Sequence, residues 1–368
     1  MNYETKTVSF GDKKIGEGHP CFIVLEAGPT HDGLETAKKL VKEAADAGAD
    51  AVKFQILDPD RLVADKQQLF EFQILVNRET GETKTVSEPL YDLLKSRSLE
   101  KNEWRELKKY SDSLGLAFFA TAGFEDEIEL LEELKCDSIK IASADVNHIP
   151  LIRRAAKTGM CIQLDTGNST LGEIEKAVDA IRAEGNENIV IHQCPSGYPA
   201  RLDSVNLRII TTLKQMFGYP AAYSDHVPGW EMDIAAVAMG ANMVEKTITL
   251  DRTTPSVEHI MSIEPTQMQA FVKAIRDTET AMGQSRRIMS AEEQTKRDAV
   301  RRSIFLSEPA KAGQKLADVK IEFRRPGYGI GPDQYEELKE LIFIKDCPSD
   351  HRLSYTDLSS EESASCAA

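Results

Sequence analysis

Eight short apolar segments, each followed by a stretch of helical periodicity, constrain the fold of this 368-residue chain more than any other feature. The apolar segments cover residues 22–27, 50–55, 116–121, 138–143, 161–166, 189–194, 220–224 and 242–248. Apolar strands that alternate with amphipathic helices pair in parallel. Eight such units predict an α/β fold, a closed (β/α)8 (TIM) barrel, with a doubly wound open sheet as the alternative.

The character of the sequence changes near residue 283, and this change predicts the domain organisation. We expect a barrel domain over 1–283, a charged linker over 284–300, a small β-rich domain over 301–346 and a disordered tail over 347–368. The small domain alternates β-like runs with Gly and Pro turns, whereas the tail is Ser-rich without apolar periodicity. Within the barrel, the polar connection 57–98 is long, and connections of that length are typically functional or mobile.

The charge balance excludes several classes of partner. Lys and Arg total 45 and Asp and Glu total 60, which gives a net charge of −15. An acidic surface disfavours nucleic acid and anionic membranes, so a phosphate-bearing ligand needs local Lys or Arg. We see no apolar run of transmembrane length and no apolar leader segment. None of the six cysteines forms a CxxC pair, so we expect reduced thiols and a cytoplasmic protein.

Polar residues gather at the C-terminal ends of the expected strands. In a (β/α)8 barrel these ends meet at one face, where catalytic groups lie. Buried polar groups without partners are costly, so a set of this size predicts a solvated pocket rather than isolated helix caps. The residues are Glu26, Lys53, Gln55, Thr121, Lys140, Ser143, Asp145, Asp165, Thr166, His192, Ser224, Asp225, His226, Glu245 and Thr247.

Two of these residues, Lys53 and Lys140, emerge inside apolar strands. A lysine in such a strand is rarely fully buried without an anionic partner. Together with Thr121, Ser143 and Ser224, the two lysines form a candidate cradle for a phosphate or a carboxylate. A strand lysine also serves as a Schiff-base nucleophile, and spacing alone leaves both roles open.

Several motifs occur in a characteristic order along the chain. They are EAGPTHDG (26–33), VKFQ (52–55), KIASAD (140–145), YSDH (223–226), VEKTITLDR (244–252), PSVEH (255–259) and FRRPGYGI (323–330). Through them the chain resembles the N-acetylneuraminate (sialic acid) synthase family, including its legionaminate, pseudaminate and spore-coat-polysaccharide relatives. The region 301–346 resembles the SAF (antifreeze-like) domain that these enzymes carry.

The resemblance implies a particular reaction. Such enzymes condense phosphoenolpyruvate with the open-chain aldehyde of a hexose such as an N-acetylmannosamine. C3 of phosphoenolpyruvate attacks the aldehyde, water adds at C2, and phosphate leaves by C–O cleavage, which gives a nonulosonic acid. A divalent cation, Mn²⁺ or Mg²⁺, polarises the aldehyde. The resemblance also implies a domain-swapped homodimer in which Arg325 reaches the partner subunit's site.

The family's functional positions fall on particular residues of this chain. Glu26, Asp145 and His226 take the catalytic positions. Glu26 is expected near the reacting aldehyde or the attacking water, and His226 matches the first metal-binding histidine. The expected substrate-binding residues are Lys53, Gln55, Thr121, Lys140, Ser143, Ser196, Tyr198, Ser224, Glu258 and Arg325. Among them, the resemblance assigns phosphoenolpyruvate to Lys53, Thr121, Lys140, Ser143 and Ser224, and the sugar to Tyr198 and Glu258.

Three positions depart from the family pattern. The family reads EKH after the eighth strand, where the histidine is the second metal ligand, but here Thr247 occupies that position. A threonine hydroxyl is a poor ligand beside imidazole, so we expect weaker metal binding unless His259 or a carboxylate substitutes. Asp145 stands where the family has a glutamate, and Asp165 stands where it has a phosphate-contacting serine.

Two alternatives to this function follow from the same residues. One is a Schiff-base aldolase on the same barrel, and the other is a non-catalytic relative that binds carbohydrate, which Thr247 favours. A decaying site need not retain its charged residues, so their presence favours the enzyme. The retained residues are Glu26, Lys53, Lys140, His226 and Arg325.

Overall fold

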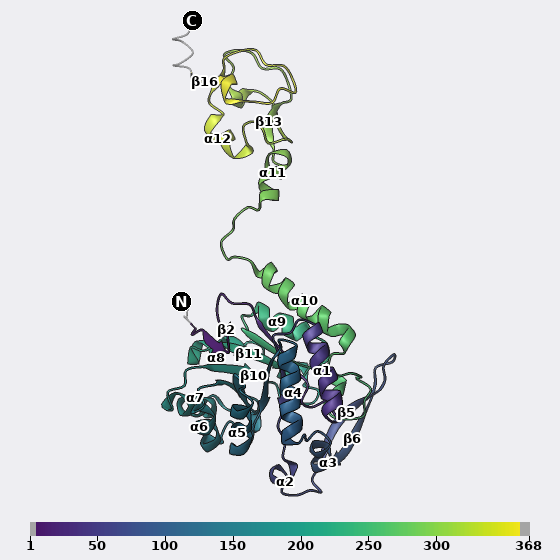
Figure 1. Ribbon diagram of the computed structural model, residues 1–368. Helices are drawn as coiled ribbons and strands as arrows, with labels where there is room; N and C mark the ends of the chain where they lie inside the picture. The colour runs from purple at the N-terminus through teal and green to yellow at the C-terminus, as the bar shows by residue number, and fades with distance from the viewer. Residues whose placement is uncertain (1–4, 361–368) are drawn as a thin grey trace. The chain divides into compact units, whose positions relative to one another are not determined.

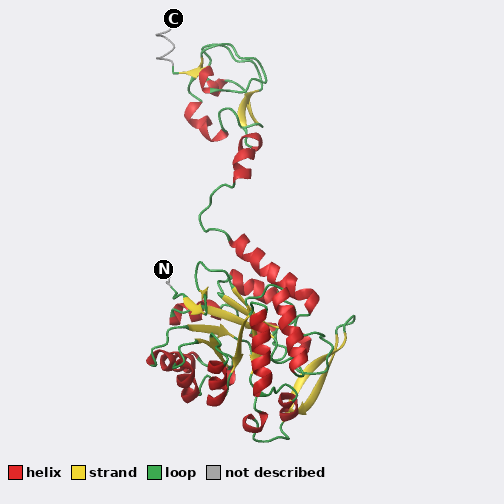
Figure 2. Ribbon diagram, in the orientation of Figure 1, coloured by secondary structure: helices red, strands yellow, loops and turns green. Residues whose placement is uncertain are grey.

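The computed structural model describes residues 5–360 and divides into two compact units at the Gly283–Gln284 boundary. In the first unit, eight parallel strands close a barrel. Figure 2 shows barrel strands with helices packed around them. The strands are β3 (Phe22–Glu26), β4 (Ala51–Gln55), β7 (Ala117–Thr121), β8 (Ser138–Ile141), β9 (Cys161–Asp165), β10 (Ile189–Gln193), β11 (Ala221–Asp225) and β12 (Met243–Thr247). Since β12 pairs with β3, the predicted closed barrel is confirmed and the open-sheet alternative is excluded.

Helices cover the outside of the barrel (Figure 1). They are α1 (Leu34–Asp46), α4 (Lys101–Ser113), α5 (Glu125–Glu133), α6 (Ile149–Ala156), α7 (Leu171–Ala183), α8 (Ile209–Phe217), α9 (Glu231–Ala238) and α10 (Pro265–Met282). Helix α7 shows how the sequence specifies them. Thr170 and Glu173 form a capping box at its N-terminus, a device worth about 1 kcal/mol, and Ile174, Val178 and Ile181 form its buried face.

A short N-terminal hairpin, β1 (Val8–Phe10) and β2 (Lys13–Ile15), packs at the end of the barrel opposite the strand C-termini. Its apolar side chains share a core cluster with residues near the N-terminal ends of the strands, including Phe22 and Val190. The apolar pattern of residues 8–15 does not predict this hairpin. It closes the lower end of the barrel interior, so the interior is accessible from the opposite face.

The connection after β4 is not the extended polar loop that the sequence suggested. It contains α2 (Pro59–Leu62), β5 (Leu69–Asn77), β6 (Glu82–Pro89) and α3 (Leu90–Lys95), and β5 and β6 form an antiparallel hairpin. Phe72, Leu93 and Val257 form a small apolar cluster between this insertion and the segment after β12. Arg78 adds ion pairs to Asp251 (2.8 Å) and Glu264 (2.5 Å), so the insertion is fixed beside the mouth of the barrel.

The second unit has a hydrophobic core of its own. Its helices and strands are α11 (Ala291–Val300), β13 (Ser303–Leu306), β14 (Ile321–Arg324), α12 (Tyr335–Leu338), β15 (Ile342–Phe343) and β16 (Leu358–Ser359). Cys347, Leu353 and Leu358 are buried in this core, and β16 pairs with β15. The tail predicted to be disordered from residue 347 is therefore wrong for 347–360, because apolar residues at irregular spacing still contribute to a small core. The remainder, 361–368, lies outside the described residues.

Short 3₁₀ turns complete the fold. They are η1 (Ser143–Asp145), η2 (Leu202–Ser204), η3 (His259–Met261), η4 (Leu316–Asp318), η5 (Pro332–Gln334) and η6 (Tyr355–Asp357). No helix within residues 5–360 is both long and apolar enough to cross a membrane.

Candidate active site

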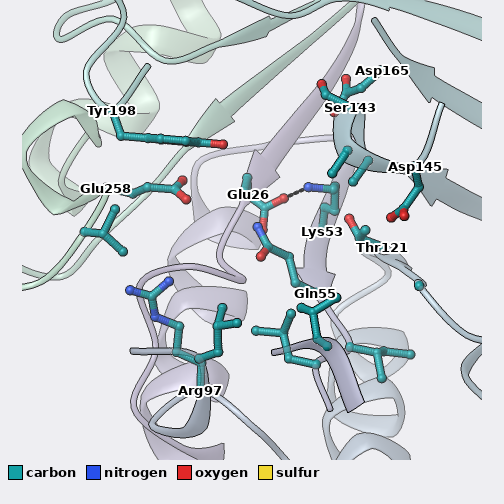
Figure 3. Close-up of a pocket in the computed structure, with 18 of the residues that line it drawn as sticks. Glu26, Lys53, Gln55, Arg97, Thr121, Ser143, Asp145, Asp165, Tyr198 and Glu258 are labelled. Carbon is teal, nitrogen blue, oxygen red and sulfur yellow. Dashed lines mark ion pairs between the residues drawn. The ribbon is translucent and has the colours of Figure 1, made fainter. Parts of the chain in front are cut away.

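A cavity of about 410 Å³ opens at the C-terminal ends of the barrel strands. Its walls come from the strand ends, from η1, and from the insertion after β4 (Figure 3). Most of the side chains that the sequence placed in a pocket line it. These are Glu26, Lys53, Gln55, Thr121, Ser143, Asp145, Asp165, Tyr198, Ser224, His226, Glu245, Thr247 and Glu258.

Strand register explains why these side chains meet. Glu26 on β3 lies opposite Lys53 on β4, and Ser224 on β11 lies opposite Glu245 on β12. Because all eight strands run in parallel, the last residue of each emerges at the same face. Residues separated by more than two hundred positions in the sequence are therefore neighbours in the barrel.

Three of the predicted substrate-binding residues do not line the cavity, and neither do Thr166, His192 and Asp225 at the strand ends. Lys140 is fully buried beneath its floor. Ser196 is exposed, and its hydroxyl donates a hydrogen bond to Asn168 Oδ1 (2.9 Å). Arg325 lies in the second unit, where it is exposed just after β14, so its role in a partner subunit's site stays a prediction.

The floor of the cavity is a buried ionic cluster. Lys53 pairs with Glu26 and, at 3.1 Å, with Glu245. Glu245 also pairs with Lys140 at 2.8 Å, and Asp165 lies 2.9 Å from the same Lys140 Nζ. Glu245 thus bridges the two lysines, whereas Glu26 and Asp165 each face one of them. The anionic partners that the sequence analysis required for these lysines are side chains of the protein itself.

Three protein groups surround the ammonium group of Lys140, which carries three N–H bonds. Lys140 Nζ donates a hydrogen bond to Glu245 Oε2 (2.8 Å) and contacts His192 Nδ1 at 3.0 Å. Asp165 Oδ1 lies 2.9 Å from Nζ as an ion pair but accepts no hydrogen bond from it. His192 Nε2 in turn contacts Gln163 Oε1 at 2.8 Å, which fits a neutral imidazole with its proton on Nε2. A ligand can contact Lys140 only if one of these partners gives up its place.

Burial and ion pairing shift the pKa values of the ionisable groups in this cluster in different directions. Burial lowers the pKa of Lys140, but the carboxylates of Asp165 and Glu245 outweigh it and raise that pKa above its usual value. Burial raises the pKa of Glu245, but Lys140 and Lys53 outweigh it and hold that pKa well below its usual range. Burial raises the pKa of Asp165, and the single neighbouring lysine only partly offsets it. Lys140 is therefore a cation rather than a nucleophilic amine.

His226 presents one ring nitrogen to the cavity. Its Nδ1 lies 3.0 Å from the carbonyl oxygen of Pro195, which only accepts hydrogen bonds, so Nδ1 carries a proton. Nε2 has no protein partner within the described part of the chain, and it is left to contact a ligand. The ring of Tyr198 lies against the imidazole, with centroids 4.9 Å apart. Burial raises the pKa of the nearby Glu258 carboxyl.

The cavity residues do not by themselves form a metal site. His226 supplies one imidazole, and the position expected to supply a second carries the hydroxyl of Thr247. Across residues 5–360, the single His/Cys/Asp/Glu trio close enough to share an ion is Cys347, His351 and Asp357, in the second unit. Among the cavity carboxylates, Glu26, Asp165 and Glu245 are engaged with lysines.

Arg97 is a cavity residue that the sequence analysis missed. It follows α3, is 4% exposed, and donates one hydrogen bond, to Ser256 Oγ (3.1 Å). No carboxylate among the described residues pairs with it, and Figure 3 shows it at the opposite end of the cavity from Asp165. Nothing in the sequence separates Arg97 from the other basic residues of the insertion, because its burial depends on how the hairpin folds.

Fold and cavity together define a (β/α)8-barrel enzyme whose site is built from strand ends. The chain belongs to the NeuB family, whose sequence model matches residues 40–287. It is 34% identical to an N,N'-diacetyllegionaminic acid synthase of Legionella pneumophila, over 89% of this chain and 92% of that one. It is 33% identical to the human N-acetylneuraminate-9-phosphate synthase, over 73% of each chain.

Solved structures agree with this assignment. The N-acetylneuraminic acid synthetase of Leptospira borgpetersenii superposes with a TM-score of 0.70 at 30% identity, covering 80% of this chain and 96% of that one. The spore coat polysaccharide biosynthesis protein SpsE of Bacillus subtilis gives a TM-score of 0.64 at 29% identity, covering 97% and 100%. The family predicted from the motifs is confirmed, and the chain is a transferase of the sialic acid synthase type.

Proposed function

We propose that this enzyme condenses phosphoenolpyruvate with the aldehyde of an N-acetylmannosamine-like hexose and releases phosphate and a nonulosonic acid. The observation that carries the proposal is the pair of lysines at the cavity floor. The hydroxyl groups of Thr121, Ser143 and Ser224 stand at neighbouring strand ends. Cations and hydroxyl donors in one enclosed place suit a small, doubly anionic donor.

The donor occupies the end of the cavity around Ser143 and Asp165. There its acid groups are bound, and C3 points toward the second substrate. Attack of C3 on the aldehyde carbon forms the new C–C bond and leaves positive character at C2. Water adds at C2, and the C2–O bond to phosphate breaks with the electron pair leaving on phosphate. Holding both reactants in one cavity accelerates the reaction because the bimolecular step becomes effectively unimolecular.

The acceptor occupies the end around Tyr198, Glu258 and Gln55, where ring and amide groups can contact sugar hydroxyls. His226 Nε2 faces the same space, so a protonated His226 is suited to give a proton to the aldehyde oxygen as it becomes an alkoxide. Glu26 lies between the two ends in Figure 3, and we assign it the attacking water or the reacting aldehyde. Asp145 lies at the donor end, and its catalytic role is part of this proposal.

A Schiff-base aldolase is the rival reaction on the same residues. It needs a neutral lysine amine. The raised pKa of Lys140, which follows from Asp165 and Glu245, opposes that role. Lys53 also has two carboxylates against its ammonium group. The ion pairs around both lysines therefore oppose imine formation.

The test is phosphate release from phosphoenolpyruvate with a panel of hexoses, with and without an N-acetyl group and a 6-phosphate. Release that depends on one hexose supports the proposal. Trapping of pyruvate on the protein by borohydride, without phosphate release, supports the aldolase instead. Exhaustive chelation, followed by Mn²⁺ or Mg²⁺, decides whether a divalent cation is required.

Three further features belong to this proposal. A homodimer would let Arg325 of one subunit complete the partner's site, as the resemblance implies. The second unit would then act as the SAF-like module. Cytoplasmic location fits the buried, unpaired thiols of Cys21, Cys136, Cys161, Cys194 and Cys347.

A further inference from the structure

The buried floor of the cavity carries more negative than positive charge. Glu26, Asp165 and Glu245 supply three carboxylates, and Lys53 and Lys140 supply two ammonium groups. The formal charge of the cluster is therefore −1 when all five groups are ionised. An anionic donor that enters this floor adds further negative charge to a site of low dielectric, where uncompensated charge is costly.

Of the three carboxylates, Asp165 is the least compensated. Glu245 contacts both lysines and accepts a hydrogen bond from Ser224 Oγ (3.2 Å). Glu26 pairs with Lys53 and accepts the backbone N–H of Gly28 (2.7 Å). Asp165 has only Lys140, and it shares that lysine with Glu245. It also lines the cavity, so a ligand reaches it directly.

Geometry adds a second requirement. Two of the three N–H bonds of Lys140 are committed to Glu245 and His192, and the third faces Asp165, which is ion-paired with Lys140 but accepts no hydrogen bond from it. Glu245 is held by two cations, and His192 is fixed from its other side by Gln163. Asp165 is the one partner of Lys140 that can be neutralised without leaving another lysine unpaired.

We propose that Asp165 makes donor binding proton-coupled: phosphoenolpyruvate binds to the enzyme form in which Asp165 is a neutral carboxylic acid. The proton comes from solvent and stays on Asp165 while the donor is bound. The donor then replaces Asp165 as an anionic partner of Lys140. The neutral carboxylic acid has an O–H donor at the position where the sialic acid synthase family, which the chain resembles, has a serine hydroxyl. This inference rests on the proposed function, because it takes phosphoenolpyruvate as the donor.

The other groups that face Asp165 cannot take this role. Lys140 on β8 and Lys53 on β4 are cations, and Glu245 on β12 is stabilised as an anion by both. His192 on β10 lies 3.7 Å away, and burial keeps its pKa well below its usual range, so it stays neutral. The thiol of Cys194, which follows β10, has its pKa raised by burial and also stays neutral.

The proposal predicts how donor affinity depends on pH. Above the pKa of Asp165 in the free enzyme, each binding event takes up about one proton, and affinity falls about tenfold per pH unit. Phosphoenolpyruvate does not itself cause this fall above neutral pH, because the second ionisation of a phosphate ester is complete there (pKa about 6). Lys140, whose pKa Asp165 and Glu245 raise, keeps its proton over the same range.

The experiment is calorimetric titration of the full-length enzyme with phosphoenolpyruvate alone, from about pH 6 to about pH 9.5, in pairs of buffers that differ in ionisation enthalpy. The wild type is compared with Asp165→Ser and Asp165→Asn, the second of which preserves shape if the first does not fold. Asp58→Ser is the matched control, since it removes a cavity carboxylate whose side chain is 39% exposed.

The expected result is proton uptake and a falling affinity in the wild type and in Asp58→Ser. Both Asp165 variants should bind phosphoenolpyruvate without proton uptake and without a fall in affinity as pH rises. Wild-type binding that is independent of pH across the range, or an unchanged slope in the Asp165 variants, overturns the inference while leaving the donor assignment intact. Failure of the wild type to bind phosphoenolpyruvate at any pH refutes the proposed function instead.

Discussion

Replacing Lys140 with methionine should cost more stability than any simple loss of a ligand contact. The substitution keeps the length of the side chain but removes the cation that faces both Glu245 and Asp165. The formal charge of the buried floor changes from −1 to −2. Breaking a buried ion pair by removing one partner costs about 3–5 kcal/mol. That is a large share of the roughly 5–15 kcal/mol that holds a typical folded protein together.

Part of this loss should be recovered by removing the extra carboxylate. In Lys140→Met/Asp165→Asn, one of the two unpaired charges is gone, so we expect a coupling energy of about 0.5–3 kcal/mol in the double-mutant cycle. The loss in Lys140→Met should also depend on pH. Because Asp165 binds its proton more tightly in the folded than in the unfolded chain, stability falls as pH rises between its unfolded and folded pKa values. Acidification toward the unfolded pKa should therefore rescue the variant in part.

Urea unfolding followed by tryptophan fluorescence measures these quantities. Both tryptophans, Trp104 and Trp230, lie in the barrel unit, so the signal reports the barrel and not the second unit. Lys42→Met, which removes an exposed pair with Asp46 on α1, is the control and should change stability little. A loss below about 1 kcal/mol in Lys140→Met, or no recovery in the double mutant, would refute this account of the floor.

Three other predictions concern binding and assembly. Arg97→Ala should raise the KM for the acceptor without changing the KM for phosphoenolpyruvate, and Arg97→Lys should restore part of the loss; equal changes in both constants would place Arg97 elsewhere in the mechanism. Thr247→His should raise affinity for Mn²⁺ by about tenfold, or ~1.4 kcal/mol, in a direct titration, and unchanged affinity would show that this position does not reach the ion. Arg325→Ala and His226→Ala should each be poorly active, and mixing them should restore activity after subunit exchange. No recovery once exchange is demonstrated would argue that the second unit serves its own barrel.

The barrel could be predicted because its signal is local and repeated. An apolar run such as 50–55 followed by an amphipathic helix carries its own evidence, and eight repeats fix the architecture. The hairpin β5–β6 could not be predicted in the same way. In β5 only Phe72 and Leu75 are buried, the other apolar residues are exposed or partly buried, and β6 is mostly polar and exposed. The ordered stretch 347–360 was missed for the same reason.

The positions of the strand ends determine which side chains share the cavity but not which of them form ion pairs. A list of polar strand ends predicts which side chains share a cavity, because parallel strands bring their ends to one face. It does not predict which of them pair. Lys140 appears in that list as part of a candidate cradle for a phosphate or carboxylate, yet in the structure its ammonium group is surrounded by Glu245, Asp165 and His192.

Pairing depends on how β8, β9 and β12 are spaced around the barrel, which is a property of closure and not of any one strand. Glu245 and Asp165 lie on strands that are not adjacent, and closure still brings both carboxylates to one lysine. A substitution at one strand end therefore changes the charge state of another. Asp165, in the place of a hydroxyl, alters what Lys140 can bind, although Lys140 itself is unchanged. The donor specificity of such a barrel follows from the balance of its floor charges, and retention of the lysines alone does not establish it.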